Sequence, residues 1–142
     1  MTQGLLQLGD IADVDGIANE IYVPYQGSAA IVLSVLTGYE GTTNPPESYG
    51  GSLDLYFADL SKAPSTPVIV STIGVITNSS PPLEADHDYA ILSTNDDGDG
   101  KRTVTARNPW GATDVFQLAD IWSATRVVNH LTDWNELVWP GH

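Results

Sequence analysis

Cysteine is absent from the whole chain of 142 residues. This absence excludes disulfide bonds and thiolate metal sites, and it leaves the chain without a thiol nucleophile of its own. Basic residues are also scarce, with 5 Lys and Arg against 18 Asp and Glu. Because nucleic-acid backbones are bound through basic surfaces, we expect no nucleic-acid partner. The acidic balance fits solubility, attraction of metal ions or a basic partner equally well.

Long hydrophobic runs are absent as well. No stretch approaches the roughly 20 apolar residues of a membrane-spanning helix, and residues 1–19 lack the basic and apolar regions of a signal peptide. We therefore expect a soluble protein without a membrane partner; its compartment stays open, with the cytoplasm slightly favoured. The length and the ordinary apolar fraction predict one domain over residues 1–142, in which residues 1–24 are ambiguous and could be a truncated N-terminal part.

Hydrophobic periodicity predicts two helices in the first half of the chain. The first runs from Ala29 to Leu36 and ends at Gly38; it is apolar almost all round, which predicts burial in the core. The second begins after Ser52, a good N-cap residue, and carries its apolar stripe at spacings of three and four residues. The segment 42–51 between them is rich in Asn, Pro and Gly and predicts a loop.

The second half of the chain is rich in β-branched residues. The run from Val68 to Ile76 predicts a buried strand, and the run from Val115 to Leu118 predicts a short one. A turn of helix is expected around Leu118–Trp122, whereas the pattern from Arg126 to Trp139 leaves strand and coil both open. Helices followed by an antiparallel meander predict an α+β fold.

A β-hairpin is the central feature of this half. Its predicted arms run from His87 to Thr94 and from Lys101 to Arg107, joined by the Asp- and Gly-rich turn at residues 95–100. Because a hairpin folds its ends back beside each other, His87 is expected to lie close to Asn108. An amide oxygen that accepts from one imidazole nitrogen fixes the tautomer and leaves the other nitrogen free to act as a base.

These residues resemble a known family. His-x-Tyr-Ala-Ile-Leu at 87–92, a hairpin, and Arg-Asn-Pro-Trp-Gly at 107–111 are similar to the second half of a calpain-type, papain-like cysteine protease domain. In that family a Gly-His-Ala-Tyr-like strand supplies the histidine and Asn-Pro-Trp-Gly supplies the asparagine. Residues 26–38 resemble its glycine-led helix ending in Leu-Thr-Gly, and Ser71-Thr72 its Val-x-Ala-Ser-Thr-Pro strand. The resemblance covers roughly residues 25–118.

The resemblance implies the fold and the site. It implies a papain-like second half, with two or three N-terminal helices followed by an antiparallel sheet or barrel-like meander. It makes His87 the general base, Asn108 the residue that orients it, and Trp110 the ring that shields their hydrogen bond from water. The alternatives without a catalytic role are a structural histidine for His87, a turn-forming asparagine for Asn108 and a core aromatic for Trp110. No metal-ligand spacing is present, so calcium is suggested by the family alone, and the partner implied is a protein or peptide substrate.

The missing cysteine leaves more than one function open. The first hypothesis is a calpain-like cysteine endopeptidase subdomain whose nucleophile lies on a separate Cys-bearing half. The second is a catalytically inactive pseudoprotease that binds a peptide or protein. A structural domain in which Asn-Pro-Trp-Gly is a coincidence is the third. Whether the chain belongs to an active enzyme therefore stays open, and the isolated chain is expected to be inactive.

Overall fold

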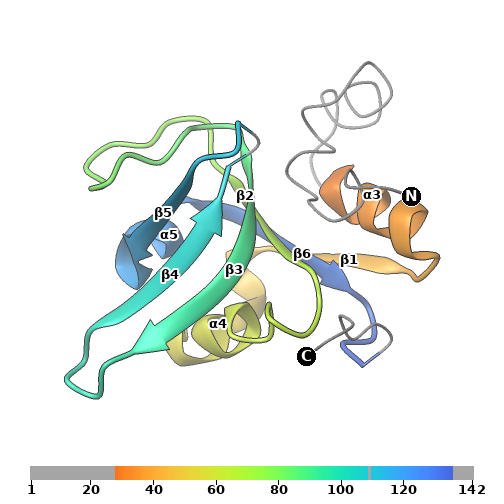
Figure 1. Cartoon of the computed structure of the whole chain (residues 1–142), viewed down its shortest axis with the longest axis horizontal. Coiled ribbons are helices and arrows are strands. Elements are labelled where there is room, and N and C mark those ends of the chain that lie inside the picture. Colours follow the sequence, from red (N-terminus) through yellow and green to blue (C-terminus); the bar gives the residue numbers. More distant parts are fainter. Residues whose placement is uncertain (1–27, 109, 136–142) are drawn as a thin grey trace.

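The structure is a computed structural model that describes residues 28–108 and 110–135 (Figure 1). The predictions for the ambiguous stretch 1–24, for Pro109 and for the tail beyond residue 135 lie outside the described residues. The described elements, in chain order, are α3 (Ser28–Thr37), β1 (Gly41–Asn44), the 3-10 helix η2 (Pro46–Tyr49), α4 (Leu53–Leu60), β2 (Val68–Thr72), β3 (Asp88–Asp96), β4 (Arg102–Arg107), β5 (Thr113–Gln117), α5 (Leu118–Ala124) and β6 (Thr125–Leu131).

The described strands form a six-stranded antiparallel sheet in the order β1-β6-β2-β3-β4-β5. Strands β2 to β5 are a meander of neighbours along the chain, and β6 then returns to lie between β1 and β2. With helices packed on this sheet, the predicted α+β class is confirmed. The predicted order needs correcting, because β1 precedes α4 and α5 lies between β5 and β6.

Most helices and strands lie near the positions that the local sequence pattern predicted. Ser52 caps α4 as predicted, since its hydroxyl accepts from the Leu55 amide at 3.1 Å. The predicted loop at 42–51 is wrong in part, because it contains β1 and η2. The predicted strand from Val68 to Ile76 ends at Thr72, after which the Ile73 amide bonds to Ala124 at the end of α5. The segment left open from Arg126 onward holds most of β6, which lies between β1 and β2.

Alternation along the strands divides the buried side chains between the two faces of the sheet. The larger cluster includes Val70, Val104 and Phe116 and packs under α4 and α5. The smaller cluster on the opposite face joins Ala29 and Leu33 of α3 to Ile69 and Leu131 of the sheet. Figure 1 shows α3 over the β6 and β1 side, away from the other two helices.

Helix α3 is buried on one side only. Its close approach to β1 is visible at Gly41, where an added Cβ would lie 2.4 Å from the Ala30 carbonyl oxygen. Ile31 and Val35, on its other side, are 50% and 67% exposed. The prediction that this helix lies wholly in the core is therefore wrong, and the structure leaves an apolar strip on its outer face.

Candidate functional site

The predicted hairpin is present and carries the sequence-predicted residues at one end. Strands β3 and β4 pair antiparallel from Ala90 opposite Arg107 to Asp96 opposite Arg102. Asn108 lies just after β4, as the sequence predicted, whereas His87, predicted to begin the first arm, lies just before β3. A tight turn then leads through Trp110 and Gly111 into β5. The elements that position the site are thus the open end of the hairpin and the β4–β5 turn.

The His87 imidazole is half-buried and held on two sides. Its Nδ1 lies 2.8 Å from the Ala85 carbonyl oxygen, which can only accept, so Nδ1 carries a proton. In the neutral ring, this tautomer leaves the lone pair on Nε2 as the basic one. The Trp110 ring meets the imidazole edge-to-face, with centroids 5.6 Å apart and planes at 61°. These two contacts orient the imidazole and make Nε2 the nitrogen with the free lone pair.

Asn108 makes different hydrogen bonds from those the sequence predicted. Its Oδ1 accepts from the Ala112 amide at 3.1 Å, and its backbone amide donates to the Ala112 carbonyl oxygen at 2.9 Å. The Asn108 carbonyl in turn accepts from Gly111 at 3.0 Å. In this structure the side chain stabilises its own turn, and the Ala85 carbonyl holds the His87 proton. A backbone carbonyl gives no sequence signal, so Ala85 was not among the predicted residues.

Trp110 lies beside His87, but its role as a shield for a His87–Asn108 hydrogen bond stays a prediction, because the Asn108 side-chain oxygen bonds to Ala112 in this structure. The Trp110 side chain is 64% exposed, so the alternative of an ordinary core aromatic is excluded. Gly111 after it has φ of +95°, a left-handed conformation that favours glycine. The turn thus presents a large aromatic surface beside the imidazole instead of burying it in the sheet.

Thr72 is the residue that fixes the backbone of His87. The buried Thr72 hydroxyl accepts from the His87 amide at 2.9 Å and donates to the Glu84 carbonyl at 2.7 Å. The Thr72 amide donates to the His87 carbonyl at 2.8 Å. Tyr89 closes the same loop, since its hydroxyl accepts from the Glu84 amide at 2.8 Å. Burial raises the pKa of the Tyr89 hydroxyl, which keeps it protonated.

Replacing Thr72 with valine is expected to destabilise the protein by about 1–3 kcal/mol, because the partly buried His87 amide and Glu84 carbonyl lose their hydroxyl partner. Thr72→Ser keeps the hydroxyl and is the matched control, expected to lose about 0.8 kcal/mol for one buried methyl group. Urea unfolding followed by tryptophan fluorescence measures both. Equal losses in the two variants would show that the hydroxyl does not hold the His87 loop.

A chain of polar side chains crosses the sheet and ends beside His87. Thr43 of β1 donates to Asn129 of β6 at 3.0 Å, and Asn129 donates to Ser71 of β2 at 2.9 Å. Ser71 donates to Asp88 at the start of β3. Asn129 is fully buried, and its amide also donates to the Ile69 carbonyl. These bonds fix the relative positions of four strands at the end of the sheet where His87 lies.

Asp86, which precedes His87, is bound by Arg126 of β6. Its carboxylate accepts from Arg126 at 2.9 Å, and its backbone has φ of +55°. A positive φ is uncommon for any residue except glycine. The loop therefore turns sharply at Asp86, and His87 follows it at the end of the sheet where β3 begins.

His130, isolated in the sequence, is part of a second polar cluster. It is 5% exposed, and its Nδ1 lies 2.6 Å from the Leu131 carbonyl oxygen, while Nε2 contacts the side-chain oxygen Oδ1 of Asn44. The ring stacks on Trp134 with centroids 3.9 Å apart, and Lys62 lies 4.2 Å from the Trp134 ring centroid. Contacts of this kind join β6, the edge strand β1 and the segment after β6.

The His130 cluster is expected to make stability depend on pH. Burial lowers the pKa of His130 below its ordinary value of 6.5, with the nearby Lys62 charge acting in the same direction and Asp59 opposing it. The unfolded chain therefore binds this proton at a higher pH than the folded chain. The free energy of unfolding should fall below about pH 6.5, by up to about 1.4 kcal/mol per pH unit from this one group.

The His130→Gln variant isolates that contribution. We expect the stability advantage of the native chain over this variant to shrink between pH 7.5 and pH 5, measured by urea unfolding. An advantage that stays constant or grows on acidification would contradict a lowered pKa in the folded chain. Changes shared by both proteins come from other groups and do not bear on His130.

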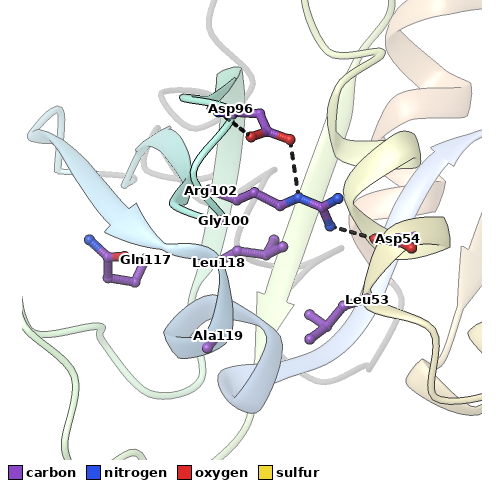
Figure 2. A pocket seen from close by; sticks show the side chains of 9 residues that line it. Leu53, Asp54, Asp96, Gly100, Arg102, Gln117, Leu118 and Ala119 are labelled. Carbon is purple, nitrogen blue, oxygen red and sulfur yellow. Dashed lines mark hydrogen bonds and ion pairs between the residues drawn. The ribbon is translucent and has the colours of Figure 1, made fainter.

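The other end of the hairpin borders a hollow of about 630 Å³. Figure 2 shows Arg102 of β4 between Asp96 of β3 and Asp54 of α4, with nitrogen–oxygen distances of 3.3 and 2.6 Å. Phe57 lies under the guanidinium, 4.9 Å from ring centroid to Arg102 Cζ. The carboxylates raise the pKa of Arg102, which is thus charged at any ordinary pH. This hollow lies at the opposite end of the hairpin from His87.

Within residues 28–108 and 110–135, no group of three or more His, Asp or Glu side chains could hold a metal ion. No described helix has the length and apolar character needed to cross a bilayer. No family model and no curated protein matches the chain. The functional assignment therefore depends on the residues of the site and their geometry.

Proposed function

We propose that this chain is the His- and Asn-bearing half of a calpain-like cysteine endopeptidase domain, whose nucleophilic cysteine is supplied by another polypeptide. The observation that carries the proposal is the pairing of His87 with Trp110 of the Asn-Pro-Trp-Gly turn at the open end of one hairpin. In this role His87 would take the proton of the cysteine thiol and later return it to the leaving amine.

Backbone conformations also support the proposal. Asp86 occupies the position that glycine holds in the family's Gly-His-Ala-Tyr motif, and its φ is +55°. Gly38 and Gly111, which match the glycines of Leu-Thr-Gly and Asn-Pro-Trp-Gly, have φ of +79° and +95°. Each position thus adopts the conformation for which glycine is preferred.

The exposed apolar strip on α3 fits a chain that packs against a second half. Ile31 and Val35 are exposed on this strip, and Trp110 is exposed beside the candidate base. Exposed apolar groups of this size commonly mark contact surfaces. In the active state proposed for the two-chain enzyme, Asn108 would turn from Ala112 toward the imidazole when the partner covers the site.

Reconstitution tests the proposal. The purified chain is mixed with the Cys-bearing half of a calpain-type domain, with and without calcium, and cleavage of a fluorogenic peptide is followed. We expect cleavage that iodoacetamide abolishes and that a Cys→Ala variant of the added half does not show. Stable association without thiol-dependent cleavage would reject the endopeptidase proposal.

A pseudoprotease that binds a peptide or protein is the second candidate. It is favoured by the absence of cysteine from all 142 residues and by the continuous core that the described residues bury on their own. This candidate predicts that the chain unfolds cooperatively by itself and that His87→Ala leaves peptide binding unchanged. Loss of binding in this variant would count against it.

A further inference from the structure

The two edges of the sheet differ in how well they are protected. Edge strand β1 is four residues long, is followed by Pro45 and Pro46, and packs closely against α3. Edge strand β5 has five residues and carries neither proline nor lysine. Proteins usually protect an exposed edge with such residues or with a covering element, because unpaired backbone groups bind other strands. Among the described strands, only β4 pairs with β5.

Alternate residues of β5 point their backbone N–H and C=O groups away from β4, toward the free edge of the sheet. The Asn108 amide donates to the Ala112 carbonyl, and antiparallel partners alternate between bonded and non-bonded pairs along a ladder. Asp114 and Phe116 therefore point their backbone groups toward β4. Thr113 and Val115 point their N–H and C=O groups toward the free edge, and Gln117 points its N–H there. This pattern matches the backbone of one added strand.

The charge of the chain decides which strand fits the edge. A second copy would bring together two chains with a net charge of −13 each, which opposes association through β5. Asp114 on β5 is exposed, and Gln117 borders the hollow where Asp54 and Asp96 both pair with the single Arg102, which leaves one net negative charge among these three side chains. Figure 2 shows Gln117 on one side of this hollow and Asp54 on the other, with Arg102 between Asp54 and Asp96. An extended segment with lysine or arginine side chains complements this surface.

The opposite end of β5 adjoins the candidate site. Thr113 follows the turn that carries Trp110, and Trp110 contacts His87. A strand of five residues spans about 17 Å, so an added strand would extend from this turn to the acidic end of the hairpin. Val115, at the centre of the edge, is 53% exposed and offers an apolar contact between the two ends.

We propose that the free edge of β5 binds an extended, basic peptide segment by strand addition, next to the His87 site. This inference rests on the proposed function in taking a peptide as the partner, and it adds the binding mode and the charge of that peptide. Binding through the backbone at Thr113 and Val115 makes the site tolerant of sequence, whereas the carboxylates near Gln117 select for positive charge.

The test uses the chain alone and two synthetic peptides, acetyl-Lys-Val-Lys-Val-Lys-Val-amide and its counterpart with glutamate for lysine. We expect the basic peptide to shift the amide resonances of Thr113, Val115 and Gln117 and to slow their hydrogen exchange. The acidic peptide should bind at least about tenfold more weakly, and added salt should reduce the difference. Equal binding of both peptides would overturn the charge assignment.

The Val115→Pro variant tests the edge itself. Its ring removes an outward N–H and leaves the bonds to β4 intact, as proline does on edge strands, so binding should weaken about tenfold or more. Val115→Thr keeps the N–H and the β-branched shape and is the matched control. Unchanged binding in Val115→Pro would reject the site, and a dimer that this variant abolishes would show that a second copy is the occupant.

Failure of the strand-addition site is separable from failure of the proposed function. Peptide binding is measured on the chain alone, without the Cys-bearing half. Cleavage by the reconstituted enzyme is measured with the native β5 sequence. If Val115→Pro binds peptide normally while reconstituted cleavage is present, the strand-addition site is wrong and the endopeptidase proposal stands. If Val115→Pro loses peptide binding while reconstituted cleavage is absent, the endopeptidase proposal is rejected and the strand-addition site stands.

Discussion

Replacing His87 with alanine in the reconstituted two-chain enzyme is expected to lower kcat/KM by about 10²- to 10⁴-fold, the range typical of a lost general acid–base residue. In the proposed role, the Ala85 carbonyl keeps the proton on Nδ1, and Nε2 is the nitrogen that would take the thiol proton. Cleavage of a fluorogenic peptide at saturating concentrations of the Cys-bearing half measures the effect. Circular dichroism of the variant checks that the fold is kept.

Asn108→Ala is the informative comparison for His87→Ala. In the proposed active state Asn108 orients the imidazole and transfers no proton itself, so its loss should reduce kcat/KM by a smaller factor than loss of the base. Trp110→Phe keeps an aromatic ring beside the imidazole and serves as the matched control. If His87→Ala cleaves as well as the native chain, His87 is not the base and the site assignment fails.

Replacing Tyr56 with alanine is expected to lower the free energy of unfolding by about 3–5 kcal/mol, as for other large aromatic residues in cores. Tyr56 is fully buried on α4 and meets Tyr49 and Trp122 edge-to-face at centroid distances of 5.6 and 4.7 Å. Since domains are commonly stable by only about 5–15 kcal/mol, this loss would leave the chain marginally folded. Chemical unfolding in urea measures it.

Tyr56→Phe separates packing from hydrogen bonding. The Thr125 hydroxyl donates to the Ile121 carbonyl at 2.6 Å, so it accepts from the Tyr56 hydroxyl at 2.6 Å. Removing that donor leaves Thr125 with a partner, and the expected loss is about 0.5–1.5 kcal/mol. A loss in Tyr56→Ala no larger than that in Tyr56→Phe would show that the ring does not anchor α4 to the sheet.

Elements with local signals were predictable from the sequence. Ser52 is followed by apolar residues at helical spacing, and α4 begins where the cap predicts. The Asp- and Gly-rich segment between β-branched runs determines the hairpin, because such residues tolerate positive φ. The predicted turn at 95–100 begins too early, since β3 continues to Asp96. From that hairpin the positions of His87 and Asn108 at one end of the sheet follow directly.

Features that depend on distant partners were not predictable in the same way. The segment Gly41–Asn44 reads as a loop by composition, and it is a strand because β6, some 86 residues later, pairs with it. The bonding of the Asn108 side chain was missed because Ala112 offers its amide within the same turn, where an Asn oxygen is a frequent acceptor. Thr72 reads as one of several β-branched residues, and only its partners distinguish it.

The place of β6 between β1 and β2 has a consequence for synthesis on the ribosome. A nascent chain that has emerged only as far as Ala124 already contains β1 to β5, yet β1 and β2 lack the strand that pairs with both. The hydrogen bonds of the buried Asn129 and the packing of β6 side chains into both apolar clusters require residues 125–131. Folding should therefore be completed late, when the last described strand arrives, and chains ending before Thr125 should be prone to aggregation.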